Sequence, residues 1–174
     1  MIVTVIGIVI FAVMLAVDLI TKAIAAATHV AQTDFFLGIV RLYYTENKGM
    51  AFSWFSDNEA AMIVVTALTV LFIIGIGVLY FTLFKKNTPA RIVLAIIEAG
   101  AVGNLVDRLF LGYVRDFVDV SPLHFGVCNI ADFCITFGGV ALLFILLFIG
   151  KNAFFPITKK WREQAKSERK EGDE

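Results

Sequence analysis

Charged residues are scarce in this chain of 174 residues. Asp, Glu, Lys and Arg make up 17% of it, whereas 59% is hydrophobic, and the mean hydropathy is +0.85. Soluble domains contain about a quarter charged residues and roughly half apolar ones. The composition therefore argues against an ordinary soluble domain and favours an integral membrane protein.

Cysteine and histidine are also rare, with two residues of each. Cys128 and Cys134 form no C-x-x-C motif, and we expect both to be small packing residues rather than a disulfide or a nucleophile. His29 and His124 are isolated, because the sequence contains no H-E-x-x-H motif and no cysteine at ligand spacing from either. No G-x-S-x-G motif is present. We therefore expect neither a metal site nor a serine nucleophile.

Four apolar segments carry the hydrophobic excess. The first has no charge before Asp18, the second is uncharged throughout, the third is interrupted by Glu98 and further polar residues, and the fourth is uncharged from residue 133 onward. Each is long enough to cross about 30 Å of hydrocarbon. We predict an α-helical integral membrane protein that forms a single domain, with four transmembrane helices at about residues 1–27, 60–84, 92–111 and 131–150.

A cleaved signal peptide is the alternative for the first segment, because AIAAATHVAQ has small residues at A-x-A spacing. No Lys or Arg precedes the apolar run, however, and Asp18 and Lys22 interrupt its end. We therefore favour a retained helix.

Lys and Arg residues predict the orientation. They concentrate in KKNTPAR, between the second and third segments, and in the tail at residues 151–174. Basic loops stay in the cytoplasm, so both termini are expected there. The two remaining loops then face outward. Residues 34–55 of the longer one are rich in aromatic and β-branched residues around a turn signal, NKG, and we predict short strands that form a small platform on the membrane surface.

Asp18 and Lys22 are four residues apart, so a helix places them on one face. The simplest interpretation is a neutralising pair at the outer end of the first helix. The alternative is that Asp18 also contacts a substrate or orders a site.

Polar residues in the third segment form a second group. Asn104, Asp107 and Arg108 fall at i, i+3 and i+4 and share a helix face, while Gly100 and Gly103 allow a neighbouring helix to approach closely. We expect Asn104 and Asp107 to belong to a buried structural network. An Arg inside the membrane costs about 2.5–3.5 kcal/mol on insertion scales unless it is partnered. Arg108 is thus expected to pair with Asp107 through a third group, or to hold a substrate carbonyl.

Two more aspartates flank the loop between the third and fourth segments. Asp116 is expected at the end of the third helix, loosened by Gly112, and Asp132 lies with Asn129 at the start of the fourth. In an antiparallel helical hairpin these two carboxylates can face each other. Close carboxylates share a proton because both do not ionise readily, and such a pair supports amide hydrolysis. Helix capping and surface charge are the competing interpretations.

Five motifs occur in a fixed order between the four segments: DLITK (18–22), NKGMAFS (47–53), GAVGNLVDR (100–108), VRDFVDV (114–120) and NIAD (129–132). In these motifs the chain resembles the bacterial lipoprotein signal peptidases, or signal peptidase II, up to about residue 150. Met50, Glu98 and Cys128 depart from the family pattern, and Glu98 is a carboxylate without an evident partner.

The resemblance implies an aspartic endopeptidase of the bacterial inner membrane. It removes the signal peptide of diacylglyceryl-modified prolipoproteins by cleaving before the lipidated cysteine, and its active site lies toward the outer face. The implied catalytic pair is Asp116 and Asp132, with Asp119 as an accompanying polar residue. A small extracytoplasmic β-cradle and a membrane-parallel helix are implied between the first two transmembrane helices. The implied partners are prolipoproteins and membrane lipid, without a metal, an organic cofactor or a nucleic acid.

Matching of the motifs also implies roles for other residues. The pocket-lining positions correspond to Asn47, Arg108 and Asn129. The supporting polar network corresponds to Asp18, Lys22, Asn104, Asp107, Gly100 and Gly103.

Two other functions compete with the peptidase. A small proton- or ion-coupled transporter predicts carboxylates near the middle of the membrane and broken helices in a repeated arrangement, whereas these carboxylates concentrate toward one face and no repeat is evident. A non-catalytic scaffold predicts that loss of Asp116 or Asp132 leaves function intact.

Overall fold

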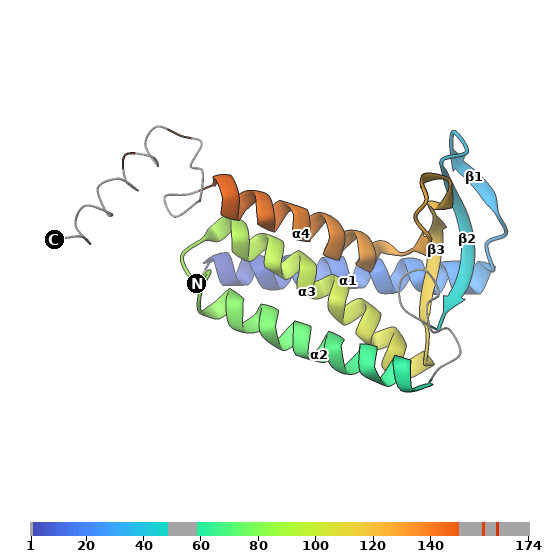
Figure 1. Ribbon diagram of the computed structural model, residues 1–174, viewed down its shortest axis with the longest axis horizontal. Coiled ribbons are helices and arrows are strands. Elements are labelled where there is room, and N and C mark those ends of the chain that lie inside the picture. Colours follow the sequence, from blue (N-terminus) through green and yellow to red (C-terminus); the bar gives the residue numbers. More distant parts are fainter. Residues whose placement is uncertain (1, 49–58, 150–157, 159–162, 164–174) are drawn as a thin grey trace.

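The computed structural model describes residues 2–48, 59–149, 158 and 163. Four long helices lie side by side in it, and a small sheet covers one end of them (Figure 1). The helices are α1 (Ile2–Thr28), α2 (Glu59–Phe81), α3 (Thr88–Leu111) and α4 (Ile130–Phe148). Three of them, α1, α2 and α4, are long and apolar enough to cross a membrane. The remaining helix, α3, carries more polar residues and packs against each of the other three.

The ends of α3 follow from its sequence. The side chain of Asn87 accepts a hydrogen bond from the backbone N–H of Ala90 at 3.1 Å, and Pro89 occupies the first turn. At the other end Gly112 adopts a left-handed φ of 76° and donates its N–H to the carbonyl of Arg108. Gly112 thereby ends the helix and turns the chain directly into a strand.

The sheet is antiparallel, in the order β1–β2–β3–β4. Its strands are β1 (Thr33–Phe36), β2 (Val40–Asn47), β3 (Val114–Asp119) and β4 (Val127–Cys128). Strands were predicted within the longer loop, and β1 and β2 lie there. The other two strands lie between α3 and α4, where none was predicted, so the sheet joins both loops into one layer.

The turn between β1 and β2 lies at Leu37 and Gly38, which both have positive φ. Asn47, the first residue of the NKG turn signal, is the last residue of β2, and Gly49 falls outside the described residues, so the predicted turn stays a prediction. Met50 and the membrane-parallel helix implied by the resemblance fall outside the described residues.

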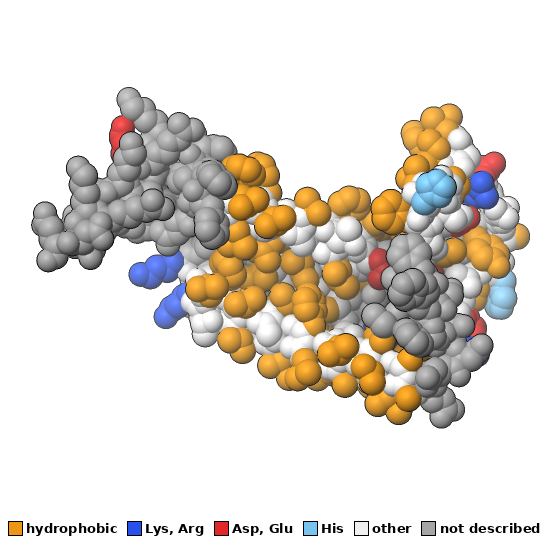
Figure 2. All heavy atoms as spheres, in the orientation of Figure 1, with side chains coloured by type: hydrophobic (Ala, Val, Ile, Leu, Met, Phe, Trp, Pro, Cys, Tyr) orange, Lys and Arg blue, Asp and Glu red, His pale blue; other side chains and the backbone are white. Residues whose placement is uncertain are grey.

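Apolar side chains cover the outside of the helices (Figure 2). Val9, Leu71 and Phe137, from three different helices, are all exposed. Buried polar residues instead gather where the helices meet the sheet, and Asp18, Lys22 and Asp116 are among them. An apolar exterior around a polar interior is the distribution of a membrane protein, with lipid as the solvent of the helices.

Candidate active site

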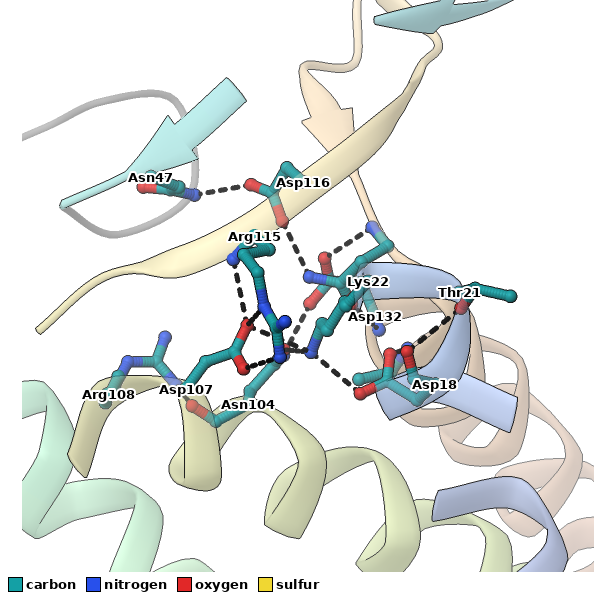
Figure 3. A network of polar contacts seen from close by, with 12 residues as sticks. Asp18, Thr21, Lys22, Asn47, Asn104, Asp107, Arg108, Arg115, Asp116 and Asp132 are labelled. Carbon is teal, nitrogen blue, oxygen red and sulfur yellow. Dashed lines mark hydrogen bonds and ion pairs between the residues drawn. The ribbon is translucent and has the colours of Figure 1, made fainter. Parts of the chain in front are cut away.

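Asn129 brings Asp116 and Asp132 together where the sheet meets the helices. Asp116 lies in β3 and is 2% exposed. One of its carboxylate oxygens accepts a hydrogen bond from Nδ2 of Asn129 at 2.6 Å, and the other accepts one from Nδ2 of Asn47 at 2.9 Å (Figure 3). The backbone N–H of Asn129 donates to Asp132 at 3.1 Å. A single residue therefore contacts both aspartates.

Asp116 is held by a strand and not by a helix end, so its predicted position at the end of the third helix is wrong. The physical reason is that Gly112 ends α3, and the β-branched and aromatic residues that follow pair with β2. The register sets Asp116 opposite Thr45 and sets Asn47 opposite Val114. This pairing is what brings the Asn47 amide to the Asp116 carboxylate.

Asn129 and Asp132 form a capping box at the start of α4. The Asn129 side chain accepts from the backbone N–H of Asp132 at 3.0 Å, and Asp132 accepts in return from the backbone N–H of Asn129. The other oxygen of Asp132 accepts a hydrogen bond from Nδ2 of Asn104 at 2.8 Å. The capping role does not exclude a chemical one, because the capping box fixes the position of the Asp132 carboxylate.

The environment of Asp116 favours its protonated form. Burial, and next the charge of Asp132, raises the pKa of Asp116 to about 7 from its ordinary value of 3.8. The hydrogen bonds from Asn47 and Asn129 and the charge of Lys22 act in the opposite direction. Near neutral pH the pair of aspartates therefore retains a proton that can be donated.

Lys22 is the centre of the supporting network and is 0% exposed. Its ammonium donates to Asp18 at 2.8 Å and to the side-chain oxygen of Asn104 at 2.9 Å. Asp18 also accepts from the backbone N–H of Ala131 at 2.8 Å. The predicted pairing of Asp18 with Lys22 is present, but the pair is buried. It connects α1 to Asn104, and through Asn104 to Asp132.

Asp107 pairs directly with Arg115, whereas the prediction considered only an indirect contact of Asp107 with Arg108 through a third group. Both guanidinium contacts of Arg115 with its carboxylate are short, at 2.6 and 3.1 Å, and the backbone N–H of Arg115 donates to it at 3.0 Å. Lys22 lies 3.8 Å from the same carboxylate. Adjacent residues on a helix point in different directions, which explains why Arg108 is not the partner. Arg115 directly precedes Asp116, so this clamp ties the start of β3 to α3.

Arg108 retains hydrogen-bonding capacity. Its Nη1 donates to the carbonyl of Asn104 at 3.4 Å, and its buried Nε has no hydrogen-bond partner among the described residues. The charges of Asp132, Asp116 and Asp107 all act on its guanidinium. Arg108 thus retains a hydrogen-bond donor that the described residues do not use.

The two glycines of α3 lie at close helix contacts, as predicted. A Cβ at Gly103 would overlap the Asp18 carboxylate, and a Cβ at Gly100 would overlap the carbonyl oxygen of Ala131. Only glycine lets α1 and α4 approach α3 closely enough to assemble this network.

The remaining candidates have structural surroundings. The side chain of Asp119 accepts from the backbone N–H of Ser121 at 2.9 Å. Cys134 is buried and Cys128 is half-buried, and both are free thiols. Glu98 is half-buried beside Gly77 of α2. No group of three potential metal ligands occurs among the described residues.

Arg115 is the residue that the sequence interpretation missed. It lies inside the VRDF motif, but nothing in a linear spacing of eight residues indicates a contact with Asp107. The contact depends on the turn at Gly112, which folds β3 back over the end of α3.

Comparison with known proteins assigns the family. The family model for signal peptidase (SPase) II matches residues 10–149. The lipoprotein signal peptidase of Caldicellulosiruptor bescii is 35% identical over 140 residues, covering 79% of this chain and 88% of the relative. That of Buchnera aphidicola is 36% identical over 123 residues, covering 68% and 72%.

Solved structures agree with this assignment. A bacterial membrane enzyme determined at 2.3 Å resolution superposes with a TM-score of 0.71 and 25% identity, covering 81% of this chain and 87% of that one. A second, at 1.9 Å resolution, gives a TM-score of 0.70 with 25% identity, and the coverage is 81% and 92%. The chain belongs to the signal peptidase II family.

Proposed function

We propose that this protein is an aspartic endopeptidase that removes the signal peptide from diacylglyceryl-modified prolipoproteins, with Asp116 and Asp132 as its catalytic pair. The observation that carries the proposal is the contact of both carboxylates with Asn129, combined with the raised pKa of Asp116. Membership of a protease family supports peptide hydrolysis.

The chemistry follows from one proton shared by two carboxylates. With the shared proton on Asp116, whose pKa is raised, Asp132 accepts a proton from a water molecule that attacks the scissile carbonyl carbon. Asp116 donates its proton to the carbonyl oxygen, which becomes a hydroxyl of the tetrahedral intermediate. That hydroxyl then returns its proton to Asp116 while the C–N bond breaks, and the proton taken from water passes from Asp132 to the leaving nitrogen.

Neighbouring side chains bind and orient the substrate in this proposal. Arg108 donates to a substrate carbonyl with the hydrogen-bonding capacity that the described part of the chain leaves unused. Asn47 and Asn129 hold the Asp116 carboxylate from two sides. Lys22 and Asp18 position Asn104, which in turn orients Asp132.

The membrane arrangement completes the proposal. All four helices span the bilayer, both termini face the cytoplasm, and the sheet lies on the outer surface, in agreement with the basic segments at residues 85–91 and 151–174. Asp116 lies in β3 and Asp132 in the first turn of α4, and these two elements meet at the sheet end of the bundle (Figure 1). A substrate that is anchored by its own diacylglyceryl group places its cleavage site at that depth.

Cleavage by the purified protein in lipid tests the function. Diacylglyceryl-modified prolipoprotein is compared with the same precursor without the lipid, and the products are sequenced. We expect a single cut before the lipidated cysteine and no cleavage of the unmodified precursor. Equal cleavage of both precursors would contradict the substrate assignment. Proton uptake into liposomes without any cleavage would favour the transporter.

A further inference from the structure

One end of the sheet exposes a group of large apolar side chains. Their exposed fractions are 72%, 59%, 83%, 50% and 63% for Phe35, Phe36, Leu37, Leu123 and Phe125 respectively. We call these five residues the apolar edge. Soluble surfaces rarely expose so many large apolar side chains together, so the apolar edge requires an explanation of its own.

Two separate segments form the apolar edge. The end of β1 supplies Phe35 and Phe36, and the following turn supplies Leu37. The 3₁₀ turn Ser121–Leu123 with the residues after it supplies the other two. The strand register places them at the same end, because Arg41 pairs with Asp119 and Asp119 pairs with Val127. Val40 and Val120, which follow and precede these turns, pack in one cluster.

Charge is excluded from the β1–β2 turn. Residues 35–40 contain no charged side chain, and the nearest charges, Asp34 and Arg41, form an ion pair with each other across the hairpin at 3.5 Å. Leu37 occupies a position with φ of 48°, where turns normally carry Gly, Asn or Asp. A large apolar residue thus stands where a water-exposed turn would favour a small polar one.

The apolar edge lies at the end of the helix bundle that carries the sheet. The sheet runs across the ends of the helices, and the β1–β2 turn projects beyond them on the side of α4 (Figure 1). The space-filling view shows apolar side chains on this projection and along the helices below it (Figure 2). Phe137 and Val140 of α4 are 66% and 63% exposed and face lipid when α4 spans the bilayer.

We propose that the apolar edge inserts into the interfacial region of the outer leaflet beside α4 and anchors the sheet to the lipid surface. Aromatic side chains favour this depth, and a lipid environment stabilises the exposure of all five residues. The inference goes beyond peptide cleavage. It uses from the proposed function only the outward placement of the sheet.

Spin-label depth measurements test the proposal in the full chain. Leu37→Cys and Phe125→Cys are labelled in a background with Cys128→Ala and Cys134→Ala, and are reconstituted in phosphatidylcholine–phosphatidylglycerol liposomes. Tyr43→Cys is the matched control, because Tyr43 is also an exposed residue of the sheet but lies outside the apolar edge. Its neighbour Tyr44 packs in the cluster with Ala25 of α1, so the Tyr43 side chain lies on the opposite face of the sheet. Molecular oxygen concentrates in lipid and a nickel chelate stays in water, so their relative collision rates report depth.

We expect the labels at positions 37 and 125 to collide severalfold more with oxygen, relative to the nickel chelate, than the label at position 43. Equal ratios at all three positions would overturn the proposal. Dipolar broadening that increases with the protein-to-lipid ratio would overturn it as well, by showing that a second copy of the chain covers the apolar edge. Cleavage activity is assayed on the same samples, so failure of anchoring and failure of the proposed function give different results.

Discussion

Lys22→Met removes the buried cation at the centre of the supporting network. The Lys22 ammonium contacts Asp18 at 2.8 Å and Asn104 at 2.9 Å, and it is 0% exposed. Methionine of similar length fills the space but leaves the buried Asp18 carboxylate uncompensated. Breaking a buried pair in this way costs about 3–5 kcal/mol. For a chain of this size that corresponds to a decrease in Tm of roughly 6–20 °C.

The assay is thermal unfolding in detergent, followed by turnover of lipidated precursor. Lys85→Met is the matched control, because Lys85 is exposed and the same charge is removed. The double variant Lys22→Met with Asp18→Asn replaces the pair by neutral groups, and we expect it to be more stable than Lys22→Met alone. A Tm for Lys22→Met that equals that of the Lys85 control would refute the reasoning. So would a double variant whose loss is the sum of the single losses.

Three other perturbations test the site. Because the pKa of Asp116 is raised to about 7 from 3.8, its bound proton favours the folded state at low pH, and this contribution is lost as pH rises through 7. Because Asp116 donates its proton in the proposed reaction, we also expect kcat/KM to fall above about pH 7. Asn47→Leu removes a hydrogen bond that lowers this pKa, so it should move the fall in kcat/KM to higher pH. A fall at the same pH or at lower pH would argue against this reasoning. Arg115→Gln should lower kcat more than it raises KM and should destabilise the fold by about 1–3 kcal/mol. The control Arg41→Gln removes a partner of an exposed ion pair and should change stability by less than about 1 kcal/mol. Equal effects of the two substitutions would contradict the role given to the Arg115–Asp107 contact. Gly103→Ala should destabilise by about 1–3 kcal/mol through overlap with Asp18, and Gly139→Ala, where nothing lies within 4 Å, should not; thermal unfolding distinguishes the two.

The helices could be predicted from the sequence because apolar length alone specifies them. Residues 60–84 are uncharged, and α2 lies at Glu59–Phe81. The polar residues of α3 could be predicted to act together because their spacing places them on one face. Asn104 and Asp107 are indeed buried in one network with Lys22.

Partner choice within that network could not be predicted. Spacing along a helix predicts which side chains share a face, but it does not predict which residues from other segments will contact that face. Asp107 was matched by charge with Arg108, whereas the turn at Gly112 delivers Arg115 to it. Likewise Asp116 was placed at the end of the third helix, because a six-residue segment such as Val114–Asp119 does not show which strand will pair with it.

The most direct test of the central claim is the turnover of two single variants, Asp116→Asn and Asp132→Asn, on diacylglyceryl-modified prolipoprotein. Asn is nearly isosteric with Asp but cannot carry the shared proton or the negative charge. Asp34→Asn is the control, because Asp34 is 71% exposed and lies on the hairpin. With all three folded as judged by thermal unfolding, we expect no measurable cleavage by the first two and unchanged cleavage by the third. Near-normal turnover by either Asp116→Asn or Asp132→Asn would contradict the assignment of the catalytic pair.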